Sequence, residues 1–128
     1  MPELKKYKMF INGEWVNSDT EKIFETLNPE NNKPWAVVPE ASASDVDRAV
    51  KAAQNAFEGE WPKLLPKERA RYLRMIGDKL RENAEHLGKI ETIDTGKLYR
   101  ETYKQANYIA EYYAVSYTHL RAHETKRN

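Results

Sequence analysis

Residues 44–59 read SDVDRAVKAAQNAFEG, and in this stretch the chain changes from a strand pattern to a helix pattern. The apolar side chains recur every three or four positions, at Val46, Ala49, Val50, Ala53 and Phe57. This spacing predicts one helix with a single apolar face. Ser44 can cap the start of the helix, with Asp47 at the reciprocal capping-box position, and Gly59 ends it.

Upstream of this helix the pattern is that of short strands. Residues 8–17 hold two β-prone runs around Asn12-Gly13, a pair that tolerates the positive φ angles of a type I′ turn. Residues 22–27 and 35–38 are also β-prone, and a turn rich in asparagine and proline separates them. The sequence therefore predicts two β-hairpins before the first helix.

Three more helices are predicted downstream. The second starts near Pro66 and buries Leu73, Ile76 and Leu80, with an interruption at Asn83. The third is shorter and ends at a Gly96 C-cap, and its apolar positions are Leu87, Ile90 and Ile93. The fourth presents one apolar side, formed by Tyr99, Thr102, Tyr103, Ala106, Ile109, Ala110 and Tyr113.

These elements predict an α/β fold that lacks its main sheet. Each helix has one broad apolar stripe, and isolated hairpins are marginal in water, so the helices need a sheet to cover. We expect the main parallel sheet to be encoded downstream of Ala114 and the apolar stripes to be exposed in this chain.

The end of the chain reads as foreign sequence. Val115–Thr125 matches the translation of a transposase-based sequencing adapter, so we expect residues 1–114 to be the natural portion and residues 115–128 to be an adapter-derived tail, either disordered or extending the last helix. His119 and His123 in this tail have the spacing of two zinc ligands beside Glu124, but we interpret them as an incidental pair. His86 is interpreted as a solvated helix residue.

Composition excludes several classes of function. The 21 basic and 20 acidic residues nearly cancel, which argues against a nucleic-acid footprint or a polybasic membrane anchor. The absence of cysteine excludes a disulfide framework, a thiolate metal site and a cysteine nucleophile. No signal peptide or membrane span is predicted, so the expected location is cytoplasmic.

Four phrases of this sequence resemble, in order and spacing, the N-terminal part of NAD(P)-dependent aldehyde dehydrogenases. They are MFINGEWV at residues 9–16, FETLNP at 24–29, DVDRAVKAA at 45–53 and IETIDTGK at 90–97. The resemblance covers residues 7–114 and extends to EYYA at 111–114. It implies that this chain is the start of a Rossmann-like nucleotide-binding domain, in a protein with a further catalytic domain and a strand-mediated oligomerisation arm.

The resemblance also implies a reaction for the intact protein. A cysteine thiolate attacks a small-molecule aldehyde, hydride passes to NAD or NADP, and a glutamate-activated water releases the carboxylic acid. All of these catalytic and cofactor-binding residues belong to later segments of the family, so we expect no catalytic and no cofactor-binding residue in this chain. We therefore expect the chain to be inactive alone and the intact protein to be a homodimer or homotetramer.

The resemblance also implies one binding site within this chain, a site for a monovalent cation. In members resembling betaine aldehyde dehydrogenase, oxygens of a Thr-x-Asn-Pro strand and the aspartate before Thr-Gly-Lys hold a monovalent cation, typically K⁺. The matching positions are Thr26, Leu27 and Asp94. Oxygen ligands with one carboxylate suit such a cation.

Three alternatives remain open at this point. Asp94-Thr95-Gly96 is also the active-site triplet of aspartic proteases, although the spacing of Leu87, Ile90 and Ile93 indicates a helix rather than the required loop. A noncatalytic helical module could bind a partner through its tyrosines. A coenzyme-A-acylating semialdehyde dehydrogenase would also share this N-terminal sequence.

Overall fold

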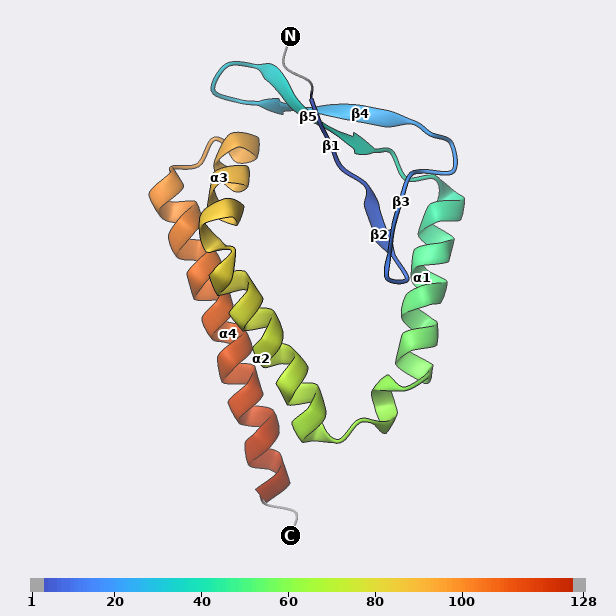
Figure 1. The fold of residues 1–128 in the computed structure, drawn as a ribbon, viewed down its shortest axis with the longest axis vertical. Coiled ribbons are helices and arrows are strands. Elements are labelled where there is room, and N and C mark those ends of the chain that lie inside the picture. The colour runs from blue at the N-terminus through green and yellow to red at the C-terminus, as the bar shows by residue number, and fades with distance from the viewer. Residues whose placement is uncertain (1–3, 126–128) are drawn as a thin grey trace. The chain divides into compact units, whose positions relative to one another are not determined.

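The computed structural model describes residues 4–125, and the side chains of residues 4–113. The chain divides into two compact units, Met1–Trp61 and Pro62–Asn128. The first unit holds the strands and α1 (Ala43–Glu58), and the second holds α2 (Pro66–Glu82), α3 (Ala84–Thr95) and α4 (Tyr99–Thr125) (Figure 1). A short 3₁₀ turn, η1 (Trp61–Lys63), lies between α1 and α2. The fold is mixed α/β with small sheets and four α-helices in the described chain, as predicted.

The first predicted hairpin is confirmed. Strand β2 (Met9–Ile11) pairs antiparallel with β3 (Glu14–Val16), and Ile11 lies opposite Glu14. The two residues between them have positive φ, 53° at Asn12 and 83° at Gly13. This is the backbone that a type I′ turn requires and that an Asn-Gly pair adopts at low cost.

The second predicted pair of strands is confirmed and gains a third strand. β4 (Ile23–Asn28) pairs antiparallel with β5 (Lys33–Pro39), and the register shifts between Thr26 and Leu27. β1 (Lys5–Lys6) pairs in parallel with β5, which gives the order β1-β5-β4. The sequence did not predict β1, because two adjacent lysines carry no strand periodicity.

The start of α1 corrects the prediction. The N-cap is Ser42 rather than Ser44, and its hydroxyl accepts a hydrogen bond from Asp45 N at 3.1 Å. Asp45, rather than Asp47, completes the capping box by accepting from Ser42 N at 2.8 Å. Both serines are followed three positions later by aspartate, so the motif alone could not choose between the two registers. Gly59 ends the helix as predicted.

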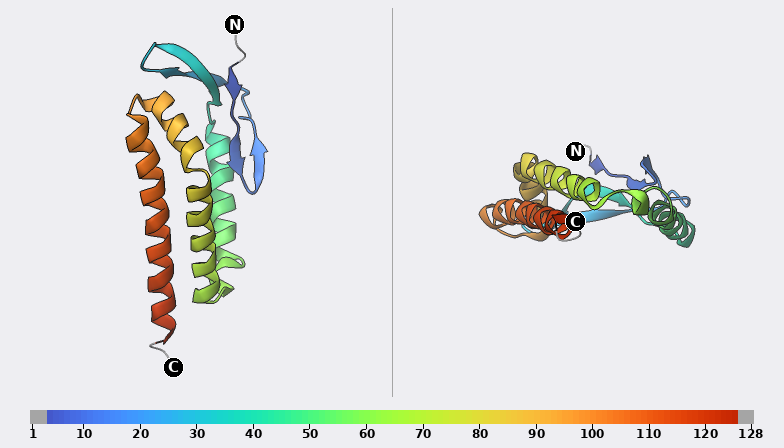
Figure 2. Two further views of the ribbon diagram at one scale, coloured as in Figure 1. Left: turned by 60° about the vertical axis from the view of Figure 1, so that its left-hand side comes forward. Right: turned by 90° about the horizontal axis from the view of Figure 1, so that it is seen from below.

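The second unit is a layer of three helices. Figures 1 and 2 show α2 and α4 running side by side, and α4 also packs on α3. Its buried side chains are small: Ala70, Ala84, Thr102, Ala106 and Ala110. Two glycines make the closest approaches, because a Cβ at Gly77 would lie 3.0 Å from Ala110 O and one at Gly88 would lie 3.0 Å from Tyr103 N. At these two glycines the backbones of neighbouring helices therefore approach closely.

The helix ends in this unit agree with the predictions. Pro66 is the first residue of α2, where Glu68 accepts a hydrogen bond from Leu65 N at 2.7 Å. Asn83 separates α2 from α3, and Gly96 ends α3 with a left-handed φ of 74°.

The predicted core of this unit is only partly correct. Ile76, expected to be buried in α2, is 44% exposed. On α4 the apolar side is split, since Thr102, Ala106 and Ala110 are buried whereas Tyr103 is 42% exposed. The reason is that the small residues of the stripe form the helix contact and the larger ones flank it.

The expectation that apolar stripes would be exposed is confirmed on α1. Val46, Val50 and Phe57 share one side of this helix and are 52%, 60% and 68% exposed. Strand β4 is similar, with Ile23 and Phe24 both more than half exposed. Single exposed apolar residues are ordinary, but a continuous stripe indicates a surface made to be covered.

Candidate functional site

The most densely bonded polar group in the first unit is the carboxylate of Asp45, which is buried at the start of α1. Its Oδ2 accepts from Ser18 Oγ and from Ser42 N, each at 2.8 Å. Its Oδ1 accepts from Asp19 N at 3.2 Å and from Arg48 Nη2 at 2.5 Å. A single side chain thus joins the first turn of α1 to the segment between β3 and β4.

These bonds determine the charge of the group. The hydrogen bond from Ser42 N is the largest influence and holds the pKa of Asp45 far below its ordinary value of 3.8, with further lowering by Ser18 and Arg48. Burial opposes this change and is outweighed. Asp45 is therefore an anion near neutral pH. This charge state suits a structural role and not that of a general acid or base.

Arg48 links the same cluster to a second carboxylate. Its Nη2 also lies 2.9 Å from Asp19 Oδ1, and Asp19 Oδ2 accepts from Ser44 Oγ at 2.8 Å. This cluster was not predicted from the sequence, because the contact of Ser18 and Asp19 with Asp45 crosses more than twenty residues. The only sequence signal for this cluster was the capping box, which fits both Ser42 with Asp45 and Ser44 with Asp47.

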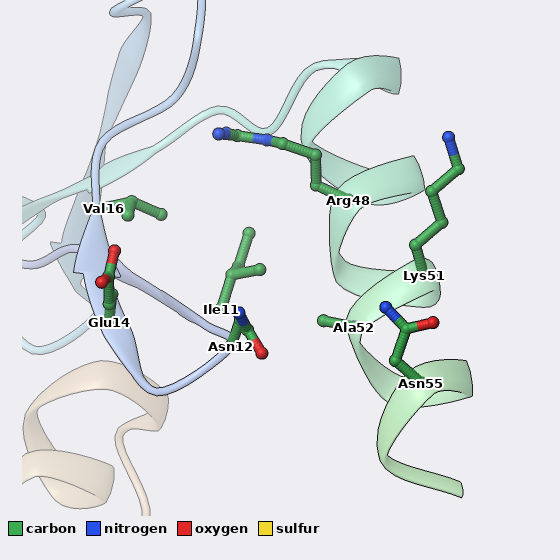
Figure 3. A pocket seen from close by; sticks show the side chains of 8 residues that line it. All are labelled: Ile11, Asn12, Glu14, Val16, Arg48, Lys51, Ala52 and Asn55. Carbon is green, nitrogen blue, oxygen red and sulfur yellow. The ribbon is translucent and has the colours of Figure 1, made fainter. Parts of the chain in front are cut away.

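A cavity of about 340 Å³ lies between the β2–β3 hairpin and α1. Figure 3 shows Arg48 reaching from α1 toward the hairpin, with Ile11 and Val16 on the hairpin side of the cavity and Ala52 on the α1 side. Its other lining residues are Asn12, Glu14, Lys51 and Asn55. Arg48 is already paired with two carboxylates, and the lining contains no hydroxyl, thiol or imidazole, so this cavity holds no Ser–His or Cys–His pair.

The predicted cation ligands fall on both units. Thr26 and Leu27 are consecutive residues of β4 at the register shift, and Asp94 belongs to the last turn of α3. Within each unit, their positions are those expected from the sequence. That Thr26, Leu27 and Asp94 together form one cation site remains a prediction.

The aspartic-protease interpretation does not fit the local structure. Asp94 and Thr95 are the last residues of a helix, and Gly96 is its left-handed cap, whereas the protease triplet requires a loop after a strand. Thr95 Oγ1 donates to Glu91 O at 2.6 Å, and Lys97 Nζ lies 2.7 Å from Glu91 Oε1. These contacts are those of a helix C-terminus.

The described residues offer no assembled metal centre. No group of three or more His, Cys, Asp or Glu side chains lies close enough together there to hold a metal ion. His119 and His123 lie beyond the described side chains, so their interpretation as an incidental pair remains a prediction. Within residues 4–125 no helix has the length and apolar character that crossing a membrane requires.

Known proteins similar to this chain in sequence and in structure are aldehyde dehydrogenases. The sequence profile of the aldehyde dehydrogenase family matches residues 15–128. Aldehyde dehydrogenase family 2 member C4 of Arabidopsis thaliana is 41% identical over 101 residues, which cover 78% of this chain and 20% of that protein.

Two solved structures show the same fold. The NAD-dependent aldehyde dehydrogenase of Sinorhizobium meliloti aligns with 94% of this chain and 24% of its own, at a TM-score of 0.88 and 28% identity. The betaine aldehyde dehydrogenase of Staphylococcus aureus, solved with NAD⁺, aligns with 83% of this chain and 21% of its own, at a TM-score of 0.80 and 36% identity.

The fold is therefore that of the N-terminal part of a dehydrogenase's nucleotide-binding domain. The match to the family profile extends over most of the chain and includes the phrases at residues 24–29, 45–53 and 90–97. The chain belongs to the aldehyde dehydrogenase family. It spans between 20% and 24% of the length of the three proteins compared.

Proposed function

We propose that this chain is the N-terminal portion of an enzyme that oxidises an aldehyde to a carboxylic acid with NAD⁺ or NADP⁺. The observation that carries the proposal is the family match over residues 15–128 together with a TM-score of 0.88 to an NAD-dependent aldehyde dehydrogenase. The solved betaine aldehyde dehydrogenase, which holds NAD⁺, supports the choice of cofactor.

The residues of this chain do not fit a dinucleotide site of their own. Binding of a pyrophosphate needs clustered glycines that let the backbone approach the phosphates at a helix N-terminus. The glycines here are isolated from one another: Gly13, Gly59, Gly77, Gly88 and Gly96. The cofactor therefore belongs to segments outside this sequence, and the contribution of this chain is structural.

The proposed chemistry also needs a residue that the chain lacks. Covalent capture of an aldehyde requires a thiolate, and the sequence has no cysteine. We therefore propose that the 128-residue chain is inactive alone. In the intact protein, α1 to α4 and the small sheets would support a nucleotide-binding domain and a homodimer or homotetramer.

A chimera tests this proposal directly. Residues 1–113 would replace the corresponding N-terminal segment of the Staphylococcus aureus betaine aldehyde dehydrogenase, and aldehyde-dependent reduction of NAD⁺ would be measured. We expect the chimera to keep activity within about one order of magnitude of the parent, because the replaced segment carries no catalytic group. A chimera that assembles normally but has lost all activity would contradict the proposal.

The cation site is a second part of the proposal, supported by the match of Thr26, Leu27 and Asp94 to the family's motif positions. In the same chimera, K⁺ is expected to raise the melting temperature more than Na⁺ does, and Asp94→Asn is expected to remove this difference. An equal response of both proteins to both ions would rule the site out.

The tail is the third part. We propose that residues 115–128 are not encoded by the natural gene, on the support of their match to the adapter translation, although the family profile is aligned through residue 128. The backbone of residues 115–125 is part of α4.

A further inference from the structure

The tip of the β2–β3 hairpin is exposed and open. Asn12 and Gly13 are both exposed. The position that a Cβ would take at Gly13 has no atom within 4 Å, apart from its chain neighbours. Among the hydrogen bonds of the described residues, none involves the backbone N–H of Gly13. An amide side chain is thus followed by an unhindered backbone nitrogen.

We propose that Asn12 is a site of spontaneous deamidation and the first asparagine of this chain to react. The Gly13 nitrogen attacks Asn12 Cγ, a C–N bond forms, and the side-chain nitrogen leaves as ammonia with the proton that Gly13 releases. Water then opens the cyclic imide at either carbonyl. Opening at one carbonyl gives aspartate, and opening at the other gives isoaspartate. The net change replaces an amide nitrogen with a water oxygen and needs no other reactant.

Asn17 and Asn32 precede Ser18 and Lys33, whose side chains hinder attack by the backbone nitrogen more than the hydrogen of Gly13 does. Five other asparagines of the described chain lack the combination for reasons of their own. Asn28 precedes Pro29, which has no N–H to act as the nucleophile. The side-chain amide of Asn31 is engaged with Lys33 N at 2.9 Å, and that of Asn83 with Lys79 O at 2.9 Å. Asn55 and Asn107 lie inside helices, where the next backbone N–H is part of the helix ladder.

The hairpin itself controls the rate. Imide closure brings the Gly13 nitrogen against the Asn12 side chain, so the backbone must leave the turn geometry fixed by the Ile11–Glu14 pair. Three residue pairs hold this hairpin, and hairpins of this size are marginal, so local opening is frequent. The Phe10 and Trp15 rings, 5.0 Å apart, oppose that opening.

The product alters the surface around the turn. A new carboxylate at position 12 would stand near Glu14, and both residues line the cavity beside α1. Isoaspartate also adds one carbon to the backbone and so breaks the two-residue loop that sets the strand register. Deamidation would therefore weaken the hairpin in ageing protein.

The test is incubation of the folded 128-residue chain at mildly alkaline pH. Peptide mapping by mass spectrometry would follow each asparagine, and isoaspartate methylation would identify the isomer. We expect conversion at Asn12 to exceed that at every other asparagine several-fold. Earlier conversion of another asparagine, or an unchanged Asn12 when others have reacted, would overturn the proposal.

A pair of variants tests the control by hairpin opening. Trp15→Ala removes the ring pair and is expected to speed conversion of Asn12 several-fold. Phe57→Ala, an exposed aromatic change on α1, is the matched control and should leave the rate unchanged. Equal rates in Trp15→Ala and the parent chain would show that hairpin opening does not limit the reaction.

Discussion

Asp45 joins the start of α1 to the segment between β3 and β4. Its carboxylate receives hydrogen bonds from two backbone N–H groups, a serine hydroxyl and a guanidinium, and the side chain is buried. Such a group stabilises the fold only while it remains an acceptor, because its neighbours are all donors.

Asp45→Asn is therefore expected to destabilise the chain. The amide would point an N–H at donors such as Ser42 N, and Arg48 would lose one carboxylate partner. We expect the melting temperature to fall by roughly 5 °C or more, measured by circular dichroism in dilute solution. Asp47→Asn, an exposed change on the same helix, is the control and should shift the transition little.

The same carboxylate predicts a pH dependence. The folded-state pKa of Asp45 is lowered, so its stabilisation is fully present above the ordinary value of 3.8 and is lost as pH falls below it toward the folded pKa. Urea midpoints of the parent chain should therefore decline below about pH 4, more steeply than those of Asp45→Asn. Parallel declines in the two proteins would show that ionisation of Asp45 does not cause the loss of stability at low pH.

Among the elements, the helices of the second unit approach one another closely at Gly77 and Gly88. Thr102 Oγ1 of α4 donates to Gly88 O of α3 at 2.9 Å, so the two helices lie close together at Gly88. Glycine in the middle of a helix ordinarily costs stability relative to alanine. At this position the close approach of α4 reverses that preference.

Gly88→Ala is accordingly expected to destabilise the second unit by about 1–3 kcal/mol, despite the higher helix propensity of alanine. A Cβ there would lie 3.0 Å from Tyr103 N and 3.1 Å from Tyr103 Cα. His86→Ala, an exposed substitution on the same helix, is the control, and chemical denaturation provides the measurement. Stabilisation by Gly88→Ala would mean that α3 and α4 lie farther apart.

Local signals in the sequence predicted most of these elements. The Asn12-Gly13 pair, Pro66 and Gly96 act through their own backbone preferences, so they could be read without the fold. The choice of Ser42 as N-cap could not, because it depends on the distant contact of Asp45 with Ser18. The exposure of Ile76 was missed for a similar reason, since periodicity gives the apolar side of a helix but not its partner.

At the scale of the whole molecule, the apolar stripes have a measurable consequence. Val46, Val50 and Phe57 form an exposed stripe on α1, and such surfaces promote association. We expect the chain to self-associate at micromolar concentration in sedimentation velocity experiments. Val50→Lys should reduce this association, whereas Asn55→Lys, on the other side of α1, should not. A strictly monomeric parent chain would contradict this expectation.

We propose that the natural gene departs from this sequence after Ala114, where the match to the adapter translation begins. Sequencing the genomic DNA across that codon tests it most directly. We predict that the natural reading frame departs from the present sequence after Ala114 and goes on to encode a glycine-rich phosphate loop and, later, a cysteine. A natural gene that encodes residues 115–128 as they stand, followed at once by a stop codon, would contradict the account.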